Sequence, residues 1–197
     1  MSKLKTGLLI LFLCLSQTLF AEGDPVAGEQ KALLCESCHG KGGHSTDPAF
    51  PKLAGQNANY IIRAAIEFQN GIRNNPMMSG ISTILKNPQD IEDIAAYLSS
   101  QKPMAGKPTG SDLAIQGEKL FTSGRCNYCH GEGGKHYAPF MPVVPVIGGQ
   151  HKEYLVKAIK DIRDGNRPGD IYDLMKKTVS EMSGTEIEAI AEYLSGL

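Results

Sequence analysis

The chain has 197 residues with 20 basic and 21 acidic side chains, so its formal net charge is −1. This near balance argues against a nucleic-acid partner, which would require an excess of Lys and Arg. Beyond the N-terminal segment no stretch is apolar enough to enter a membrane, because a spanning helix needs roughly 20 apolar residues. The length suits one ordinary domain or two small ones.

Residues 1–21 have the features of a secretory signal peptide. Lys3 and Lys5 give a positive start, residues 7–15 form a short apolar run, and small residues offer a cleavage site. An uncleaved anchor is the alternative. Cleavage would remove Cys14 and both lysines, which leaves four cysteines and a formal net charge of −3. We therefore expect the mature protein to be exported to an oxidising compartment.

The rest of the chain repeats itself. Three pairs of segments match, at offsets that drift only from 91 to 96 residues: 35–43 with 126–134, 59–73 with 153–167, and 90–100 with 186–196. A constant order with small insertions indicates a duplicated module. We predict an N-terminal domain over 22–101 and a C-terminal domain over 113–197. Residues 102–112 are rich in Pro, Gly and Lys, which is typical of a linker.

Each module predicts the same series of helices. A first helix leads into a cysteine pair, and a loop rich in Gly and Pro follows. A middle helix is expected from about 57 to 70, and its counterpart from 151 to 164, each stopped by a glycine. A last helix begins at Asn87, or at Ser183 where Glu186 completes a capping box. Since no segment shows sustained strand alternation, the predicted fold class is all-α.

The four cysteines of the mature chain lie in two copies of one motif, CESCHG (35–40) and CNYCHG (126–131). CxxCH is the signature of covalent haem c attachment. The two thiols add to the vinyl groups of the porphyrin, and the histidine binds the iron. The motif therefore predicts two covalently bound haems c, one held by Cys35, Cys38 and His39 and the other by Cys126, Cys129 and His130.

Three other uses of the cysteines explain the sequence less well. A zinc ribbon would need the two pairs much closer than 91 residues apart. A thioredoxin-like redox motif would need a βαβ setting, which the sequence does not predict. Structural disulfides leave the repeated histidine without a role. A bound haem also supplies the core that a helical module of 80–90 residues would otherwise build only marginally.

The second axial ligand of each iron is expected to be a methionine, which raises the potential and favours electron transfer. Met175 lies between the middle and last helices of the second module, 18 residues before Tyr193. In the first module Met77 and Met78 both occupy this region. Met78, 19 residues before Tyr97, is the closer match. Ordinary core packing is the alternative use of these methionines.

Two further matched pairs lie near the predicted sites. Pro51 and Pro145 begin the segments PKLAGQ and PVIGGQ. A carbonyl in such a loop can accept a hydrogen bond from the outer nitrogen of the proximal histidine and fix its tautomer. Simple loop punctuation is the alternative. Arg73 and Arg167, each just past a matched glycine, could pair with haem propionates or could be solvated charges at helix ends.

These residues resemble the dihaem cytochrome c4 family. The segment DPAFPKLAGQ (47–56) is close to the wording of that family, and the likeness covers nearly all of the mature chain. The resemblance implies two class I cytochrome c folds packed as a pseudo-symmetric pair. It favours the two loop prolines as hydrogen-bond partners of the histidines. It also implies these axial ligands: His39 and Met78 in one module, His130 and Met175 in the other.

The expected function is a periplasmic electron carrier between respiratory partners, such as to a terminal oxidase, without substrate turnover. We expect a monomer, at most loosely associated with the membrane, whose partners are an oxidase, a reductase or a flavoprotein. The alternative is the electron-accepting subunit of a flavocytochrome c sulfide dehydrogenase-like enzyme, which CHGEGGK (129–135) also resembles. A tight subunit should expose an apolar patch, for which 138–147 is the candidate; the wall of a haem pocket is the other use of that stretch.

Overall fold

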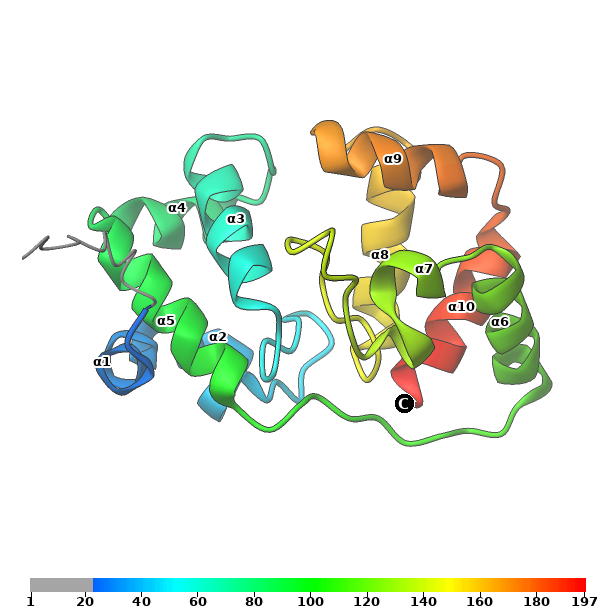
Figure 1. Cartoon of the computed structure of the whole chain (residues 1–197), viewed down its shortest axis with the longest axis horizontal. Coiled ribbons are helices and arrows are strands. Elements are labelled where there is room, and N and C mark those ends of the chain that lie inside the picture. Colours follow the sequence, from blue (N-terminus) through cyan, green and yellow to red (C-terminus); the bar gives the residue numbers. More distant parts are fainter. Residues whose placement is uncertain (1–22) are drawn as a thin grey trace, which may run out of the picture.

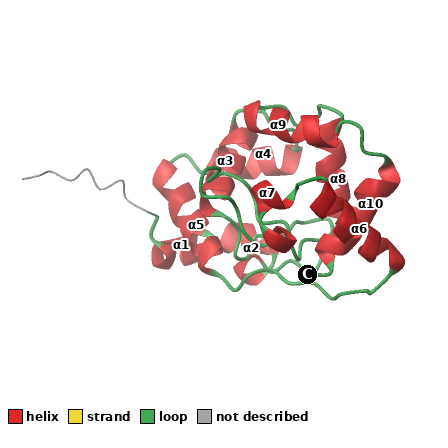
Figure 2. Ribbon diagram, turned by 45° about the vertical axis from the view of Figure 1, so that its right-hand side comes forward, coloured by secondary structure: helices red, strands yellow, loops and turns green. Residues whose placement is uncertain are grey.

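The computed structural model describes residues 23–197, apart from the side chains of residues 170 and 171. Within this range the chain forms helices and loops and no strand, so the predicted all-α class is confirmed (Figure 2). The predicted signal peptide lies outside the described residues. No helix in the described part is both long enough and apolar enough to cross a membrane.

The helices form two groups that lie side by side, the N-terminal module and the C-terminal module (Figure 1). The N-terminal module contains α1 (Pro25–Lys31), α2 (Leu33–His39), η1 (Lys41–Gly43), α3 (Ala58–Gln69), α4 (Pro76–Ile84) and α5 (Pro88–Ser100). The C-terminal module contains α6 (Asp112–Ser123), α7 (Asn127–His130), η2 (Glu132–Gly134), α8 (Lys152–Arg163), α9 (Asp170–Val179) and α10 (Gly184–Ser195). The order of elements is thus the same in both.

Several helix ends follow from the sequence. The predicted middle helices are confirmed as α3 and α8, within a residue of the expected bounds. The side chain of Asn87 caps α5 by accepting from the backbone N–H of Gln89. At α10 the predicted capping box is present, because Ser183 Oγ accepts from the N–H of Glu186 while the Glu186 carboxylate accepts from the N–H of Ser183.

In each module the first helix crosses the last at a glycine. A Cβ added to Gly28 on α1 would lie 2.0 Å from the carbonyl oxygen of Asp93 on α5. A Cβ added to Gly117 on α6 would lie 1.9 Å from the carbonyl oxygen of Ala189 on α10. The backbones can approach this closely only because neither position has a side chain. The apolar stripes of α5 and α10 complete the two cores on the inner side.

The methionine-bearing segments are helices, which the sequence reading did not predict. α4 begins at Pro76 and is capped by Asn75, whose side chain accepts from the N–H of Met78 at 3.0 Å. α9 follows Gly169 and carries Met175 near its middle. Both helices are short, and each packs against the middle helix of its own module, α4 against α3 and α9 against α8 (Figure 1).

The segment between the modules is fixed to both of them. Met104 is buried, and its N–H donates to the carbonyl oxygen of Ala54 at 3.2 Å. The N–H of Gly106 donates to the carbonyl oxygen of Leu197 at 3.2 Å. Helix α6 already begins at Asp112, inside the range expected for the linker. The connection therefore packs as part of the structure.

Two glutamines join the modules directly. The Gln56 amide donates to the carbonyl oxygen of Val146 and accepts from the N–H of the same residue, both at 2.7 Å. The Gln150 amide donates to the carbonyl oxygen of Lys52 at 2.8 Å and accepts from its N–H at 2.9 Å. Both amides are buried, so these bonds replace bonds to water.

Candidate functional site

The two CxxCH motifs adopt short helices that end at their histidines. Helix α2 ends at His39, and α7 ends at His130. Gly40 and Gly131 follow with φ of 76° and 69°, a left-handed conformation that glycine adopts without strain. All four cysteines are free thiols at partly buried positions. The spacing therefore presents two thiols and one imidazole from a single helical turn in each module.

Each histidine is buried and hydrogen-bonded to a proline carbonyl. The distance from His39 Nδ1 to the carbonyl oxygen of Pro51 is 2.7 Å, and that from His130 Nδ1 to the carbonyl oxygen of Pro145 is 2.9 Å. Burial lowers the pKa of both histidines, and the hydrogen bonds to the carbonyls offset this only in part. Since a carbonyl only accepts, Nδ1 carries the proton. Each Nε2 then keeps a free lone pair, as a metal ligand requires.

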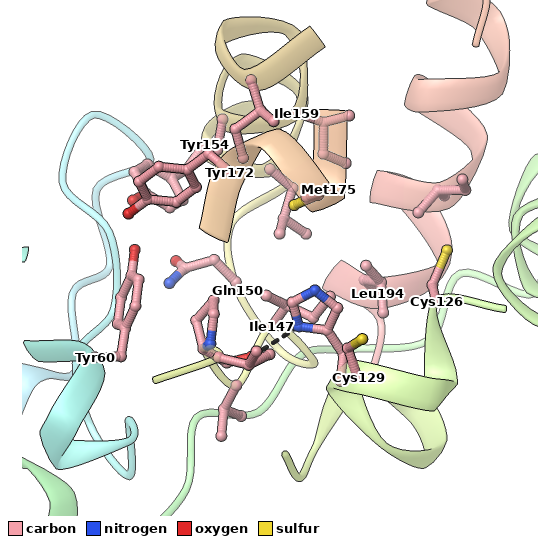
Figure 3. A pocket seen from close by; sticks show the side chains of 18 of the residues that line it. Tyr60, Cys126, Cys129, Ile147, Gln150, Tyr154, Ile159, Tyr172, Met175 and Leu194 are labelled. Atoms are coloured by element: carbon pink, nitrogen blue, oxygen red, sulfur yellow. Dashed lines mark hydrogen bonds between the residues drawn. The ribbon is translucent and has the colours of Figure 1, made fainter. Parts of the chain in front are cut away.

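A large cavity in the C-terminal module faces His130. It encloses about 1330 Å³, including the part open to solvent, and its walls are mainly apolar. Met175 points into the cavity from α9, opposite the helix that carries Cys126 and Cys129 (Figure 3). Met78 in the N-terminal module is half-buried, whereas the side chain of Met77 is 56% exposed. Burial therefore favours Met78 as the member of its pair that faces the module interior.

In the N-terminal module Glu36, between the two cysteines, holds the motif against the rest of the module. Its carboxylate accepts from the Tyr97 hydroxyl at 2.9 Å and from the N–H of Gly42 at 2.8 Å. Cys35 and Leu53 pack against the core of this module. Phe50 lies edge-on to His39, with ring centroids 6.2 Å apart. These contacts between protein residues fix the orientation of the motif within the module.

At the far end of the cavity lies a cluster of tyrosines and arginines from both modules. Arg167 is only 8% exposed, so the interpretation as a solvated helix-end charge is wrong for this residue. Its Nη2 donates to the Tyr60 hydroxyl at 2.9 Å and to the Tyr172 hydroxyl at 2.7 Å. Arg73 stacks on the Phe68 ring at 4.3 Å. The sequence analysis assigned no role to these tyrosines. A signal was present, because Tyr60 and Tyr154 are separated by the same offset as Arg73 and Arg167.

The arginines of this cluster favour negative charge at Tyr60. Burial raises the pKa of Tyr60, but the charges of Arg167 and Arg73 outweigh that effect and lower it overall. Arg167 Nε is buried and has no hydrogen-bond partner in the described part of the chain. A buried guanidinium with a free donor is costly unless an anion pairs with it. Of the two expectations for Arg167, pairing with a propionate is the one that this environment fits.

The residues of the cavity fit haem c. Its apolar walls suit the porphyrin, and two thiols lie at one side. The His130 imidazole and the Met175 thioether both line the space. The free donor of Arg167 suits a carboxylate group. Such a donor set offers covalent attachment, two axial ligands and charge pairing within one pocket.

The stretch 138–147 belongs mainly to this pocket. Val143, Pro145 and Ile147 line the cavity, and Val144 and Val146 are buried. The exposed positions of the stretch are Pro139, Phe140 and Pro142. Phe140 is 62% exposed and lies against Tyr128, with ring centroids 5.3 Å apart. The pocket-wall interpretation therefore holds for most of the stretch.

A helical module that occurs twice, each with a CxxCH helix and a histidine held by a proline carbonyl, defines a dihaem c-type cytochrome. Residues 114–197 match the cytochrome c family. The chain is 38% identical to cytochrome c4 of Pseudomonas aeruginosa over the full length of both proteins. It therefore belongs to the cytochrome c4 family, as the sequence resemblance predicted. It is an electron-transfer protein with two covalently bound haem c groups.

Two other comparisons agree with this assignment. The structure resembles the crystal structure of reduced recombinant cytochrome c4 from Pseudomonas stutzeri with a TM-score of 0.81 and 37% sequence identity, covering 89% of this chain and 99% of that chain. The sequence is also 33% identical to a thiosulfate dehydrogenase electron acceptor of Thiomonas intermedia, over 86% of this chain and 81% of that protein. Both likenesses extend over the two modules.

Proposed function

We propose that the protein is a periplasmic carrier that passes electrons one at a time between respiratory redox partners, for example to a terminal oxidase. The observation that carries this proposal is the hydrogen bond from each buried histidine to a proline carbonyl, on Pro51 and on Pro145. It occurs in both modules and leaves one imidazole nitrogen of each free for an iron. A fixed ligand set of this kind suits electron transfer without substrate binding.

The residues act as follows in this proposal. The cysteine thiols hold each haem covalently, and when bound the haem supplies a one-electron couple at its iron. His39 and Met78 would hold the iron in the N-terminal module, and His130 and Met175 would hold it in the C-terminal module. The wall of the C-terminal cavity, on which the thioether of Met175 lies, is mainly apolar and suits the porphyrin. The carbonyls of Pro51 and Pro145 keep the histidines in one tautomer and orientation.

The proposed architecture is two domains, 22–101 and 113–197, joined by residues 102–112. Separate apolar clusters, one among α2 and α5 and one among α6, α8, α9 and α10, support this division. Export through a cleaved signal at residues 1–21 is supported by the charge and apolar pattern of that segment. We propose that the mature chain acts as a monomer.

A second candidate function is electron acceptor for a thiosulfate-oxidising enzyme. It is favoured by the likeness to the Thiomonas intermedia protein of that name. The exposed Tyr128–Phe140 pair offers an apolar contact next to Cys129, at the edge of the proposed C-terminal haem. Reduction of the purified protein by thiosulfate in the presence, but not the absence, of a thiosulfate dehydrogenase would favour this function over delivery to an oxidase.

The first test of the carrier function is the visible spectrum of the reduced protein with and without carbon monoxide. If both irons have a strong sixth ligand, carbon monoxide should not change the spectrum of either haem. A response from half of the haem would mean that one iron lacks a strong sixth ligand. In that case the corresponding methionine assignment is wrong, and that module would be a ligand-binding site.

A further inference from the structure

Among the described side chains of helix α9, Tyr172 makes a hydrogen bond to the N-terminal module. Tyr172 lies one helical turn before Met175 on α9 and is only 6% exposed. Its hydroxyl donates to Glu67 Oε2 on α3 of the N-terminal module at 2.8 Å and accepts from Arg167 Nη2 at 2.7 Å. The ring of Tyr172 and the Met175 thioether project from the same part of α9 (Figure 3).

The N-terminal partner of Tyr172 is itself firmly held. Glu67 is 4% exposed, and its other oxygen accepts from Arg63 Nε at 2.6 Å. The guanidinium of Arg63 lies over one face of the Tyr172 ring at 4.9 Å, and that of Arg167 lies over the ring at 4.3 Å. Tyr172 is therefore enclosed by charged groups of both modules, and moving α9 would break charge-assisted contacts in a buried place.

The N-terminal module has no equivalent contact among the described residues. The counterpart of Glu67 by sequence offset is Asp161, which pairs with Lys157 on its own helix. Helix α4, which carries Met78, is held by Gln69 of its own module, whose amide donates to the carbonyl oxygens of Ser82 and Leu85 at 2.8 and 2.9 Å. Among the described residues, a hydrogen bond from a methionine-bearing helix to the other module is thus found at α9 and not at α4.

We propose that Glu67, through Tyr172, is a positioning residue for the Met175 ligand, so that the N-terminal module determines how firmly the C-terminal iron is closed. This inference rests on the proposed role of Met175 as an axial ligand. Movement of this part of α9 would carry Met175 away from the iron, and the bond from Tyr172 to Glu67 opposes that movement. Loss of a hydrogen bond to a charged group should raise the open fraction roughly ten- to hundredfold.

The test is a titration of the oxidised dihaem protein with imidazole, which binds only when methionine has left the iron. The far-red charge-transfer band of methionine-ligated ferric haem reports the remaining bond. We expect Tyr172→Phe, which removes only the hydroxyl, to make one of the two haems bind imidazole roughly ten- to hundredfold more tightly. Glu67→Gln should give a smaller shift at the same haem, because an amide still accepts from Tyr172 but carries no charge.

Matched variants separate this effect from a general loosening. Tyr137→Phe removes a hydroxyl from an exposed tyrosine outside the cavity, and Asp161→Asn changes the counterpart of Glu67. Both should leave imidazole binding as in the wild type. Unchanged binding in Tyr172→Phe and Glu67→Gln would overturn the inference. An equal shift at both haems would also overturn it, since the contact would then stabilise the molecule as a whole.

A further variant distinguishes failure of the inference from failure of the proposed function. Met175→Ala should remove half of the far-red band of the wild-type protein. If the band is unchanged, Met175 is not an axial ligand, and the ligand assignment under the proposed function is wrong. If half of the band is lost while the Tyr172 and Glu67 variants behave like the wild type, the assignment stands and only the control by the N-terminal module is refuted.

Discussion

Gln56 and Gln150 join the two modules through the same pair of hydrogen bonds, made in opposite directions. Each buried amide donates to a carbonyl oxygen of the other module and accepts from the N–H of that same residue. A side chain thereby completes the hydrogen bonding of a loop that belongs to the other module. The backbone groups of Val146 and Lys52 would otherwise lie between the modules without these partners.

Substitution of either glutamine should destabilise the whole protein. We expect Gln56→Ala to lower the free energy of unfolding by about 2–4 kcal/mol, because it leaves the buried N–H and carbonyl of Val146 without a partner. Gln150→Ala should cost somewhat less, because the backbone groups of Lys52 are only partly buried. Chemical denaturation of the holo protein measures this. Gln116→Ala, at an exposed position on α6, is the control and should change stability little. Equal effects from all three variants would contradict the expectation.

The helix crossings predict a different response to two glycine substitutions. Gly28→Ala should destabilise the protein by at least about 1–3 kcal/mol, since its methyl group would lie 2.0 Å from a backbone oxygen of α5. Gly80→Ala on α4 meets nothing within 4 Å and should be neutral or stabilising by up to about 1 kcal/mol. Thermal unfolding of the two variants provides the measurement. The prediction fails if Gly28→Ala is as stable as Gly80→Ala.

Asp93 should make stability depend on pH in the acid range. Hydrogen bonds from Lys31, from Gln89 and from the N–H of Asp24 lower the pKa of its carboxyl to about 2. The pKa of the Asp93 carboxyl is lower in the folded protein than its unfolded value of about 3.9. The ionised carboxylate therefore stabilises the fold, and this stabilisation is fully present above the unfolded pKa. It is lost as the pH falls through about 2.

The variant that tests this is Asp93→Asn. It should be less stable than the wild type at neutral pH, and the difference should shrink as the pH is lowered from about 4 toward 2. Urea denaturation at a series of pH values follows the difference directly. If the difference in stability between the wild type and Asp93→Asn does not depend on pH, the charge of Asp93 is not the cause of that difference.

Arg167 should raise the reduction potential of the C-terminal haem. A buried positive charge beside the cavity favours the reduced iron, which has one positive charge less. Arg167→Gln is therefore expected to lower the potential of one haem by roughly tens of millivolts. Spectroelectrochemical titration resolves the two haems. Arg163→Gln, which removes a charge paired with Asp164 at the surface, should leave both potentials nearly unchanged.

Local signals in the sequence predicted much of the fold and defined the candidate site. The CxxCH motifs, the middle helices and the capping box at Ser183 depend on residues close together in the chain. The burial of Arg167 could not be predicted in this way, because it requires tyrosines from both modules. Tyr172 could not be predicted from the repeat. At the offset that relates Met175 to Met78, the residue that corresponds to Tyr172 is Asn75, so the two modules do not share a tyrosine there.

The contacts between the modules also describe how such a molecule is assembled. Besides the glutamines, Arg167 donates to Tyr60 and Arg73 to Tyr154, so that each matched arginine reaches the matched tyrosine of the other half. Contacts that occur twice with the partners exchanged are the mark of an isologous interface between identical subunits. The two halves meet as the subunits of a two-fold dimer do, except that residues 102–112 join them into one chain.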